Sequence, residues 1–507
     1  MKRIKILSQV STVLLLMLSL TANPALALDS FFSGPRALGM AGANIASVND
    51  TNAQYYNPAA FGFMGCKTTN GEKISCDNNN LGRKNAGGDL NVSAGLRMHQ
   101  NFGDYIDTLA NIDYQRLSDN GITTQSDLVD LINLLNGLNG LDDPGNAISA
   151  RAYASLGIRA GHFAIGGRGA IEVAGRVVDI DTANLGIVNT TDLNTQITSS
   201  FSAPAGYTPT LITGSLLTDL QAAGFSADAI NSLDSVAVQQ GVTSAEIVGL
   251  TDNLATLSGQ TSGALTGGAL ADNTTTVVLN GFALAEVPLS YGYAINDHWS
   301  VGGSLKAIKG RVYGTEVLVF DDGSGDVISS VTDHYQDSTT FGLDLGIMGR
   351  YRLFNFGLIG RNLNSPEFDG FDVSTRLSNG STSLVHVASV KVKPQVAAGV
   401  AFIPLETLTL EVDYDLTEND TLLSNYATQN LSFGIEWDAF HFLALRAGAY
   451  KNMVQSDIGV VYTAGLGLNF WVMRLDIGGA YSDETARYDG KNYPKESQVS
   501  AQLSVDF

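Results

Sequence analysis

Cysteine, positive charge and long apolar runs are all scarce in this chain of 507 residues, and each scarcity excludes a class of protein. The two cysteines, Cys66 and Cys76, do not form the Cys-x-x-Cys pattern of a thiol oxidoreductase. The 29 lysines and arginines are outnumbered by 50 aspartates and glutamates, which gives a formal net charge of −21. An acidic surface repels phosphate backbones, so direct binding of nucleic acid is not expected.

The N-terminus carries the signature of an export signal. It consists of basic residues, an apolar run and a small-residue cleavage motif: Lys2, Arg3 and Lys5; Val13 to Leu20; Ala25-Leu26-Ala27. We therefore predict that residues 1–27 are a cleaved signal peptide, because the run is shorter than the ~20 apolar residues that a membrane-spanning helix needs. In an oxidising compartment Cys66 and Cys76 are expected to form a disulfide that closes a small loop.

Catalytic patterns are also missing from the sequence. The six histidines are scattered, and none of them forms a metal-binding i, i+4 pair with another. The glycine-rich stretch GHFAIGGRGA lies in a strand-like segment, without the strand, turn and helix order of a dinucleotide site. We therefore expect no enzymatic activity, no cofactor and no metal.

What the chain does contain is alternation of polar and apolar residues. In SQVSAQLSVDF, at the C-terminus, every second residue from Val499 to Phe507 is apolar or small, and polar residues stand between. This period of two is typical of a strand between two different solvents. A terminal Phe507 on such a strand resembles the signal that the outer-membrane insertion machinery recognises. The alternative is the edge strand of a soluble sandwich.

The same alternation recurs upstream, in TLTLEVDYDL, NLSFGIEW and WVMRLDI. Charges lie opposite the apolar stripe there, and lipid would penalise an Arg or Lys at its midplane by ~2–4 kcal/mol, so we expect them to face a wet, polar lumen. The predicted lumen charges are Asp344, Glu411, Asp413, Glu436, Arg446, Arg474, Asp476 and Asp506. They would form either an ion-selecting ring or a network that anchors a plug. Because both signs are present, anchoring is favoured.

Fourteen candidate strands follow from this pattern, centred near residues 93, 154, 168, 284, 306, 342, 357, 393, 411, 433, 445, 463, 477 and 501. Their connections alternate between short and mostly long, as expected of short periplasmic turns and longer extracellular loops. The predicted fold is an all-β transmembrane β-barrel of about 14 antiparallel strands, with an N-terminal hatch and helical extracellular insertions. The barrel is expected to occupy residues 88–507.

Two connections, residues 100–149 and 176–274, are too long to lack structure. The stretch SDLVDLINLLN predicts a helix with Ser126 as its N-cap. In the second insert, Thr243 and Glu246 form a capping-box pattern ahead of an apolar helical face. These helices would form a lid over the pore, bind a protein partner, or simply pack on the rim of the barrel.

Residues 28–87 are expected to form the hatch and the cysteine loop. Within them, the stretch RALGMAGANIASVNDTNAQYYNPAAFG, residues 36–62, shows neither a helical nor a strand period. This stretch resembles the hatch of the long-chain fatty-acid transporter (FadL) class of barrels. The resemblance implies a gate that ends on an Asn-Pro-Ala motif, matched here by Asn57, Pro58 and Ala59. Gly39 and Gly42 would permit close or left-handed backbone paths.

The second half resembles the TraF-type family of outer-membrane conjugal-transfer proteins. The segments that carry this resemblance are GFALAEVPLSYGYAINDHWSVGGSLK, FGLDLGI, GLIGRNL, VKPQVAAGVAF, LEVDYDLTEND, LRAGAYKN and AGLGLNF, in that order. The family implies a place in or beside a conjugative operon. The hatch class implies passage of small hydrophobic molecules.

The sequence therefore predicts a Gram-negative outer-membrane barrel, held in lipid, that binds or passes small hydrophobic molecules through a hatch-gated lumen. The alternative is a cell-surface scaffold or shuttle that binds a conjugation or surface protein through its extracellular helices. An apolar pocket leading towards the hatch would favour transport. A fully polar, filled lumen would favour the scaffold.

Overall fold

The computed structural model describes residues 31–64, 68–69, 72–73, 86–182, 184–185, 188–189, 192–259, 265–266, 273–318, 334–376, 382–423, 426–439, 442–470 and 472–506. The predicted signal peptide, the Cys66–Cys76 disulfide and the terminal Phe507 lie outside these residues. They remain predictions.

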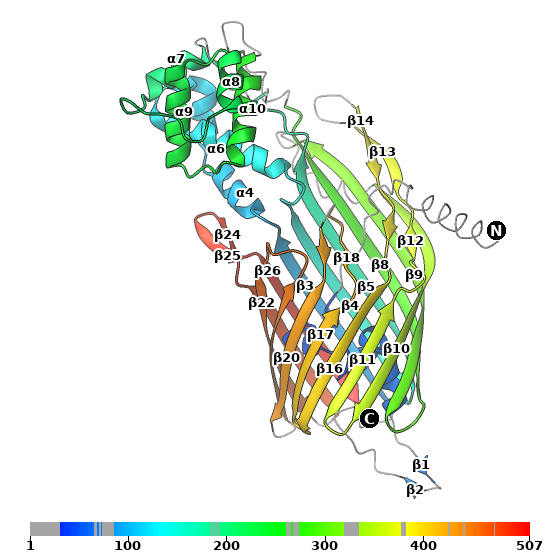
Figure 1. Cartoon of the computed structure of the whole chain (residues 1–507). Helices are drawn as coiled ribbons and strands as arrows, with labels where there is room; N and C mark the ends of the chain where they lie inside the picture. The colour runs from blue at the N-terminus through cyan, green and yellow to red at the C-terminus, as the bar shows by residue number, and fades with distance from the viewer. Residues whose placement is uncertain are drawn as a thin grey trace, which may run out of the picture.

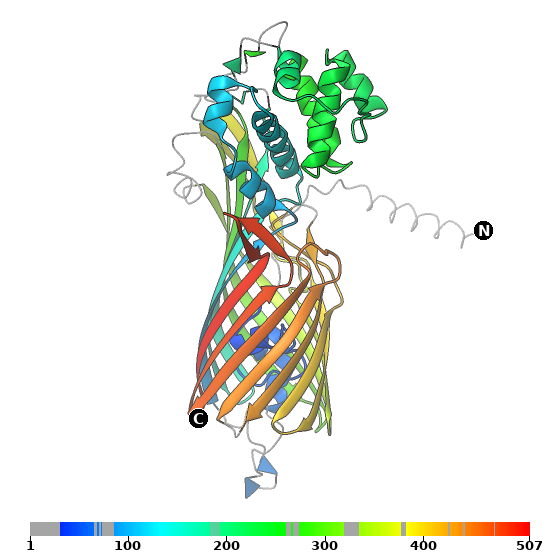
Figure 2. The same cartoon turned by 90° about the vertical axis from the view of Figure 1, so that its left-hand side faces the viewer.

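Within the described residues, fourteen antiparallel strands form one closed barrel (Figures 1 and 2). They are β3 (Ala86–Met98), β4 (Ile148–Ala160), β5 (Phe163–Val178), β8 (Thr276–Ala294), β9 (Trp299–Leu318), β10 (Tyr335–Tyr351), β11 (Phe354–Arg361), β16 (Gln395–Leu405), β17 (Leu408–Asp415), β20 (Asn430–Ala439), β21 (Leu443–Asn452), β22 (Val460–Phe470), β23 (Met473–Ser482) and β26 (Glu496–Asp506). Each strand pairs with the next along the chain, and β26 closes the ring on β3 with Val499 opposite Ala94. The predicted fold class is confirmed.

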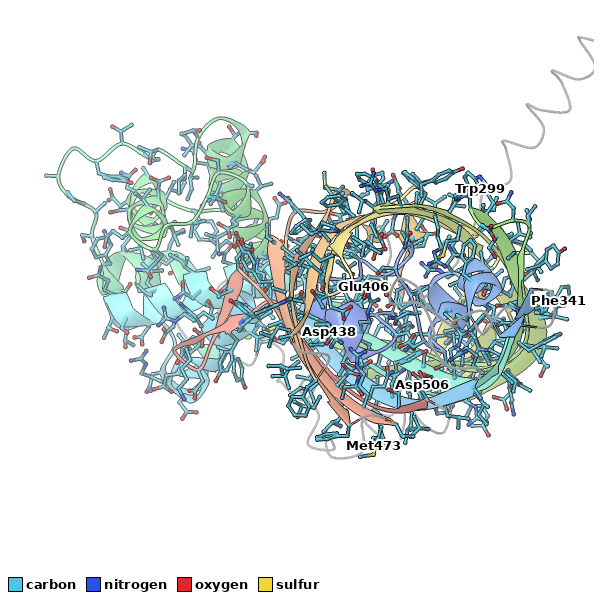
Figure 3. The ribbon with its side chains drawn as sticks, turned by 90° about the horizontal axis from the view of Figure 1, so that it is seen from below. Trp299, Phe341, Glu406, Asp438, Met473 and Asp506 are labelled. Carbon is cyan, nitrogen blue, oxygen red and sulfur yellow. The ribbon has the colours of Figure 1, made fainter. Side chains whose placement is uncertain are left out.

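The alternating residues of each strand lie on opposite faces of the barrel wall. Leu156 and Ile158 of β4 are more than half exposed on the outside, whereas Ser155 and Arg159, on either side of this pair, are buried on the inside. Figure 3 looks along the barrel and shows side chains on both faces of the ring, with Phe341 and Met473 pointing outwards. An apolar outer face of this kind is suited to lipid. Thirteen of the predicted strand centres fall within strands, but residue 393 lies just before β16, which begins at Gln395.

Two helical inserts extend from the end of the barrel that carries the long loops (Figure 1). Their helices are α4 (Phe102–Ala110), α5 (Tyr114–Asn120), α6 (Gln125–Asp142), α7 (Leu193–Ser200), α8 (Ser215–Ala222), α9 (Ala227–Gln239) and α10 (Glu246–Gly259). They share an apolar core that includes Leu128, Leu135, Leu233 and Leu254. In Figure 3 these helices lie beside the ring of strands and do not cover it.

The N-terminal ends of α6 and α10 can be compared with the predicted capping residues. The N-cap of α6 is Thr124, with Asp127 completing a capping box, so the choice of Ser126 is wrong by two residues. The cap before α10 is confirmed, since the Glu246 carboxylate accepts the backbone N–H of Thr243 at 2.8 Å. In the part of the chain that the structure describes, no helix is long and apolar enough to cross a membrane.

The loops between the barrel strands contain short two-stranded sheets. They are β1 (Thr68–Thr69) with β2 (Glu72–Lys73), β6 (Val188–Asn189) with β7 (Leu265–Thr266), β12 (Glu367–Phe368) with β15 (Val390–Lys391), β13 (Phe371–Arg376) with β14 (Thr382–Val387), β18 (Asn419–Asp420) with β19 (Ala427–Thr428), and β24 (Thr485–Tyr488) with β25 (Lys491–Pro494). The loop that carries β12 to β15, residues 362–376 and 382–394, is called the strap below. It packs against the inner wall of the barrel, where Phe368 lies 4.9 Å from Phe282 between ring centres.

The strap makes part of the lumen apolar. Phe282, Ile308 and Val312 point inwards from β8 and β9 and are buried against it, together with Phe368 and Val390 of the strap itself. The expectation of a polar interior is therefore wrong for this part of the barrel. Because the strap folds back on the wall, inward side chains there meet apolar neighbours instead of water.

Candidate functional site: the hatch and the lumen around it

Residues 31–64 fill the lumen towards the short-turn end of the barrel, and we call them the hatch (Figures 1 and 2). The hatch contains α2 (Pro35–Gly39), α3 (Ala53–Tyr56) and the 3-10 helix η1 (Pro58–Phe63). Most of its residues are buried although it has little regular structure. Its packing surface is the barrel wall, which explains why no amphipathic period marks it in the sequence.

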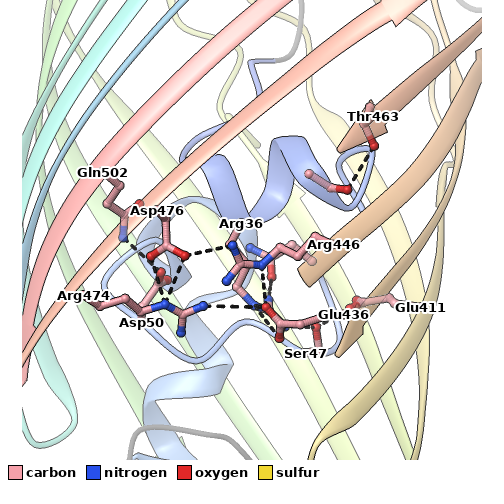
Figure 4. A network of polar contacts seen from close by, with 12 residues as sticks. Arg36, Ser47, Asp50, Glu411, Glu436, Arg446, Thr463, Arg474, Asp476 and Gln502 are labelled. Atoms are coloured by element: carbon pink, nitrogen blue, oxygen red, sulfur yellow. Dashed lines mark hydrogen bonds and ion pairs between the residues drawn. The ribbon is translucent and has the colours of Figure 1, made fainter. Parts of the chain in front are cut away.

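Arg36 joins the hatch to the wall through ion pairs (Figure 4). Its Nη2 lies 3.0 Å from the Glu436 carboxylate of β20 and also donates to the Ser47 hydroxyl at 3.0 Å. Glu436 accepts a second guanidinium, from Arg446 of β21, at 2.6 Å. Arg446 in turn donates to Asp476 of β23 at 2.8 Å. A chain of alternating charges therefore runs from the hatch across three strands.

The hatch backbone is held by two carboxylates of β17. The Asp413 carboxylate accepts the N–H groups of Asn44 at 2.7 Å and Ile45 at 2.9 Å. Glu411 accepts the N–H of Ala46 at 2.6 Å and also the hydroxyl of the neighbouring serine. A loop buried without secondary structure must find partners for its backbone N–H groups, and here the wall provides them.

Six of the eight predicted lumen charges thus lie close to the hatch: Glu411, Asp413, Glu436, Arg446, Arg474 and Asp476. The other two lie elsewhere. Asp344 pairs with Lys306 at 3.0 Å, on the strap side of the lumen. Asp506, half exposed, pairs with Arg159 at 3.4 Å. Sequence reasoning missed Arg36, because one basic residue in a segment without a period carries no pattern.

The Asn-Pro-Ala motif lies against β8, β9 and β10, each of which has a glycine at the point of contact. Asn57 is completely buried and donates from Nδ2 to the carbonyl groups of Ile45 and Ile347, at 3.2 and 3.1 Å. Its Oδ1 accepts the Ala59 N–H at 3.1 Å, which caps η1. Pro58 begins that helix, where a missing N–H costs nothing.

Glycine is required at the two predicted hatch positions for different reasons. Gly42 has a φ of +91°, a conformation that other residues rarely adopt. Gly39 lies directly against Gly465 of β22, so a side chain at either position would collide with the other segment. The carbonyl of Gly39 also accepts the Thr463 hydroxyl at 3.0 Å (Figure 4).

A cavity lies between the hatch, the wall and the strap. Its lining includes Phe31 and Tyr55 of the hatch, Tyr153, Arg168, Ala170, Leu284, Glu286, Lys306, Ile308 and Arg361 of the wall, and Pro366, Phe368 and Val392 of the strap. About 40 Å³ is open to the centre of a water-sized sphere, enough for roughly three waters at ~10–15 Å³ each. A narrow pocket with a mixed apolar and charged lining therefore lies beside the hatch, so the apolar pocket that would favour transport is present only in part.

The cavity charges were not predicted, although Arg168, Glu286 and Lys306 also lie on the polar side of alternating strands. Lys306 lies 3.0 Å from Asp344 and 3.6 Å from Glu286, and Arg168 lies 3.6 Å from Glu286. The same rule that selected the other lumen charges would have found these three.

The wall is interrupted next to this cavity. The pairing of β5 with β8 runs to Ile165 opposite Leu289 and resumes at Arg168 opposite Glu286. The unpaired residues include Pro288, which has no N–H to give to a ladder. Its carbonyl accepts the Gln54 side chain of the hatch at 3.4 Å. The hatch therefore contacts the wall where the β5–β8 ladder is interrupted.

At the long-loop end, His99 follows β3 and contacts both β4 and the loop between β21 and β22. It is buried, its Nε2 lies 3.0 Å from the Ser149 hydroxyl, and its Nδ1 lies 3.7 Å from the Asp457 carboxylate. Burial lowers the pKa of His99, although Asp457 opposes this shift. Among the described residues, no group of three or more His, Cys, Asp or Glu side chains is placed to hold a metal ion.

These features define a class: a transmembrane barrel of fourteen strands whose N-terminal segment is packed inside its lumen. The family model described as "F plasmid transfer operon, TraF, protein" matches residues 54–415, and the chain belongs to that family. The resemblance noted from the second half of the sequence is thereby confirmed. No match was found among curated proteins.

Solved structures of toluene transporters and monoaromatic hydrocarbon channels are similar to this chain. The toluene transporter TbuX of Ralstonia pickettii shares 12% identity with a TM-score of 0.43, over 93% of this chain and 97% of that one. The P. putida toluene transporter TodX shares 11% identity with a TM-score of 0.43, over 94% of this chain and 99% of that one.

Proposed function

We propose that this chain is an outer-membrane barrel of a Gram-negative bacterium that binds small hydrophobic molecules in its lumen and passes them when the hatch shifts. The short turns would face the periplasm and the helical inserts the outside, and residues 1–27 would be the cleaved signal. The supporting observation is the cavity between the hatch and the strap. Its apolar residues come from both, so movement of either would change its size.

The hatch contacts support a gate that closes in the resting state. Ion pairs with Glu436 and backbone hydrogen bonds to Asp413 hold it along one side of the barrel. On the other side, η1 lies on β8, β9 and β10 beside the Asn57 motif. A plug held in this way must lose several polar contacts together before a passage forms.

Uptake of a labelled aromatic hydrocarbon or fatty acid into liposomes tests the proposal. The cavity-filling variant Ala170→Phe is expected to reduce uptake, because Ala170 lines the cavity. The matched control is Ala154→Phe on the exposed outer face of β4, which leaves uptake unchanged. A chain that lacks residues 36–62 should open a steady ion conductance. If the intact protein takes up neither compound, the transport function is wrong.

A second candidate, a surface scaffold in conjugation, rests on the helical inserts. Their helices have an apolar core of their own and lie beside the barrel opening (Figure 3). We propose that they are free to bind a surface or conjugation protein. Capture of that partner by the intact protein, but not by a barrel without the inserts, would support this candidate.

A further inference from the structure

Arg361, at the end of β11, stands out among the buried charges of the lumen. Its side chain is 5% exposed, yet among the described residues it has no ion pair and no hydrogen bond from its side chain. Its guanidinium lies over the Tyr55 ring of the hatch, with Cζ 4.5 Å from the ring centre. A buried guanidinium normally has carboxylate or carbonyl partners, so this one is an exception that calls for a ligand.

The other charges around the cavity are already paired. Lys306 is neutralised by Asp344 at 3.0 Å and donates to Asn362 at 2.6 Å. Arg168 lies 3.6 Å from Glu286 and donates to the backbone of the hatch. Two cations are therefore matched by two carboxylates. Arg361 adds one positive charge that forms no ion pair with any described carboxylate.

Arg361 also lines a second small cavity, together with two carboxylates, Asp413 and Asp415. Asp413 there accepts two backbone N–H groups of the hatch. Asp415 accepts the N–H of Asn430 at 3.0 Å. Neither carboxylate lies within ion-pair distance of Arg361, so both serve other partners. Arg361 also lines the cavity between the hatch, the wall and the strap, where the lining carboxylate, Glu286, lies 3.6 Å from both Arg168 and Lys306.

The remaining lining defines the rest of the ligand. Phe31, Tyr55, Tyr153 and Phe368 supply aromatic surface around the position of Arg361. The open space is small, so a ring can enter only if the hatch residue Phe31 or the strap residue Phe368 moves. A compact body with an aromatic or short aliphatic group therefore fits better than a long chain.

We propose that the cavity takes a compact apolar monoanion, an aromatic or short-chain carboxylate, and that Arg361 determines this choice of charge. This inference rests on the proposed function, because it places the ligand in the same lumen. The carboxylate would receive the guanidinium N–H groups of Arg361, and the apolar body would lie between the hatch and the strap. Insertion of the body would displace the hatch, so binding and opening would be coupled.

Binding of three compounds of similar size tests the charge selection: benzoate, benzyl alcohol and benzylammonium, at neutral pH. Isothermal titration calorimetry on the full chain in detergent micelles, corrected for empty micelles, should show benzoate bound about tenfold or more tighter than the other two. In Arg361→Gln the three affinities should become similar. Arg361→Lys should keep part of the preference for benzoate, because the charge remains.

The matched control is Arg311→Gln, since Arg311 pairs with Asp337 away from the cavity and its loss should leave the preference unchanged. A merely structural role of Arg361 would weaken all three compounds equally and leave their ratio intact, which would overturn the inference. Equal affinity of the intact chain for benzoate and benzyl alcohol would also overturn it.

A parallel uptake assay in liposomes distinguishes a failure of the charge selection from a failure of the transport function. Uptake of the neutral compound without preferential binding of benzoate would overturn the charge selection and leave transport standing. Preferential binding of benzoate without uptake of any of the three would overturn transport and leave the anion site standing.

Discussion

At the scale of single residues, Arg36 links the hatch to the wall through its ion pair with Glu436. Replacing it by Gln should loosen the hatch but keep the barrel, because Glu436 retains its pair with Arg446. We expect a loss of about 1.5–3 kcal/mol in the stability of the closed hatch, the value of a hydrogen bond to a charged group. Amide hydrogen exchange across residues 36–47 should accelerate accordingly, and brief conductance openings should become more frequent in planar bilayers.

The control for this prediction is Arg116→Gln in α5, which removes an arginine far from the hatch. Unchanged exchange in Arg36→Gln would show that the backbone hydrogen bonds to Asp413 hold the hatch without it.

Asp234 of α9 is a buried carboxylate outside the barrel. It accepts the Tyr207 hydroxyl at 2.6 Å and the backbone N–H groups of Thr210, Leu211 and Ile212 at 2.6 to 2.9 Å. Burial raises the pKa of Asp234, but these hydrogen bonds outweigh it, so its pKa lies below the ordinary 3.8. Because the folded pKa is below the unfolded one, the carboxylate stabilises the helical inserts above about pH 4, and this stability is lost as the pH falls through the folded pKa.

Asp234→Asn should therefore destabilise the inserts by about 2 kcal/mol at neutral pH, and the difference from the unmodified chain should shrink in acid. Thermal unfolding followed by the helical circular dichroism signal, at neutral pH and in acid, measures both effects. Asp228→Asn, in the exposed first turn of the same helix, is the control and should change little. An equal loss at both pH values would contradict the prediction.

At the scale of elements, the strands were predictable because each of them has two different surroundings. One face contacts lipid and the other faces the lumen, so apolar and polar residues alternate along every strand. The hatch was recognised as irregular but could not be traced, since its contacts come from many strands of the barrel, including β8, β17, β20 and β23, up to 450 positions later in the chain. The strap was read only as a loop, because its apolar residues are few and its partner surface is the inside of the wall.

The close packing of η1 against β9 gives a prediction at the scale of elements. A side chain on Gly302 of β9 would lie far inside contact distance of the Pro58 carbonyl and the Ala59 N–H. Gly302→Ala should therefore push η1 off the wall and increase the conductance of an otherwise folded barrel. Gly167→Ala is the matched control, because a Cβ there would meet only one atom, at 3.9 Å. If both variants remain closed, η1 is not part of the gate.

At the scale of the whole molecule, the barrel and the helical inserts are joined through strands that are already neighbours. Met98 pairs with Ile148 across the first insert, and Val178 pairs with Thr276 across the second. Replacing residues 102–145 and 182–273 by short Gly-Ser turns should therefore leave a folded barrel. We expect its folded form to migrate faster than its heated form on a denaturing gel, as for the full chain.

The same variant separates the two candidate functions. Unchanged uptake would place transport in the barrel alone and leave the inserts to partner binding. A barrel that no longer folds would show instead that the inserts stabilise the wall, for example through the contacts of α6 with β5.

The sequence by itself determined the barrel: the number of strands, the short and long connections, and most of the inward charges near the hatch. Period-two alternation is a local property, and a membrane protein cannot satisfy its backbone in lipid without closing such strands into a ring. Only the tertiary structure decided which charges meet. Arg36 reaches Glu436, Asp344 pairs with Lys306, and Arg361 forms no ion pair within the part of the chain that the structure describes, because each outcome depends on how the hatch and the strap fold back into the lumen.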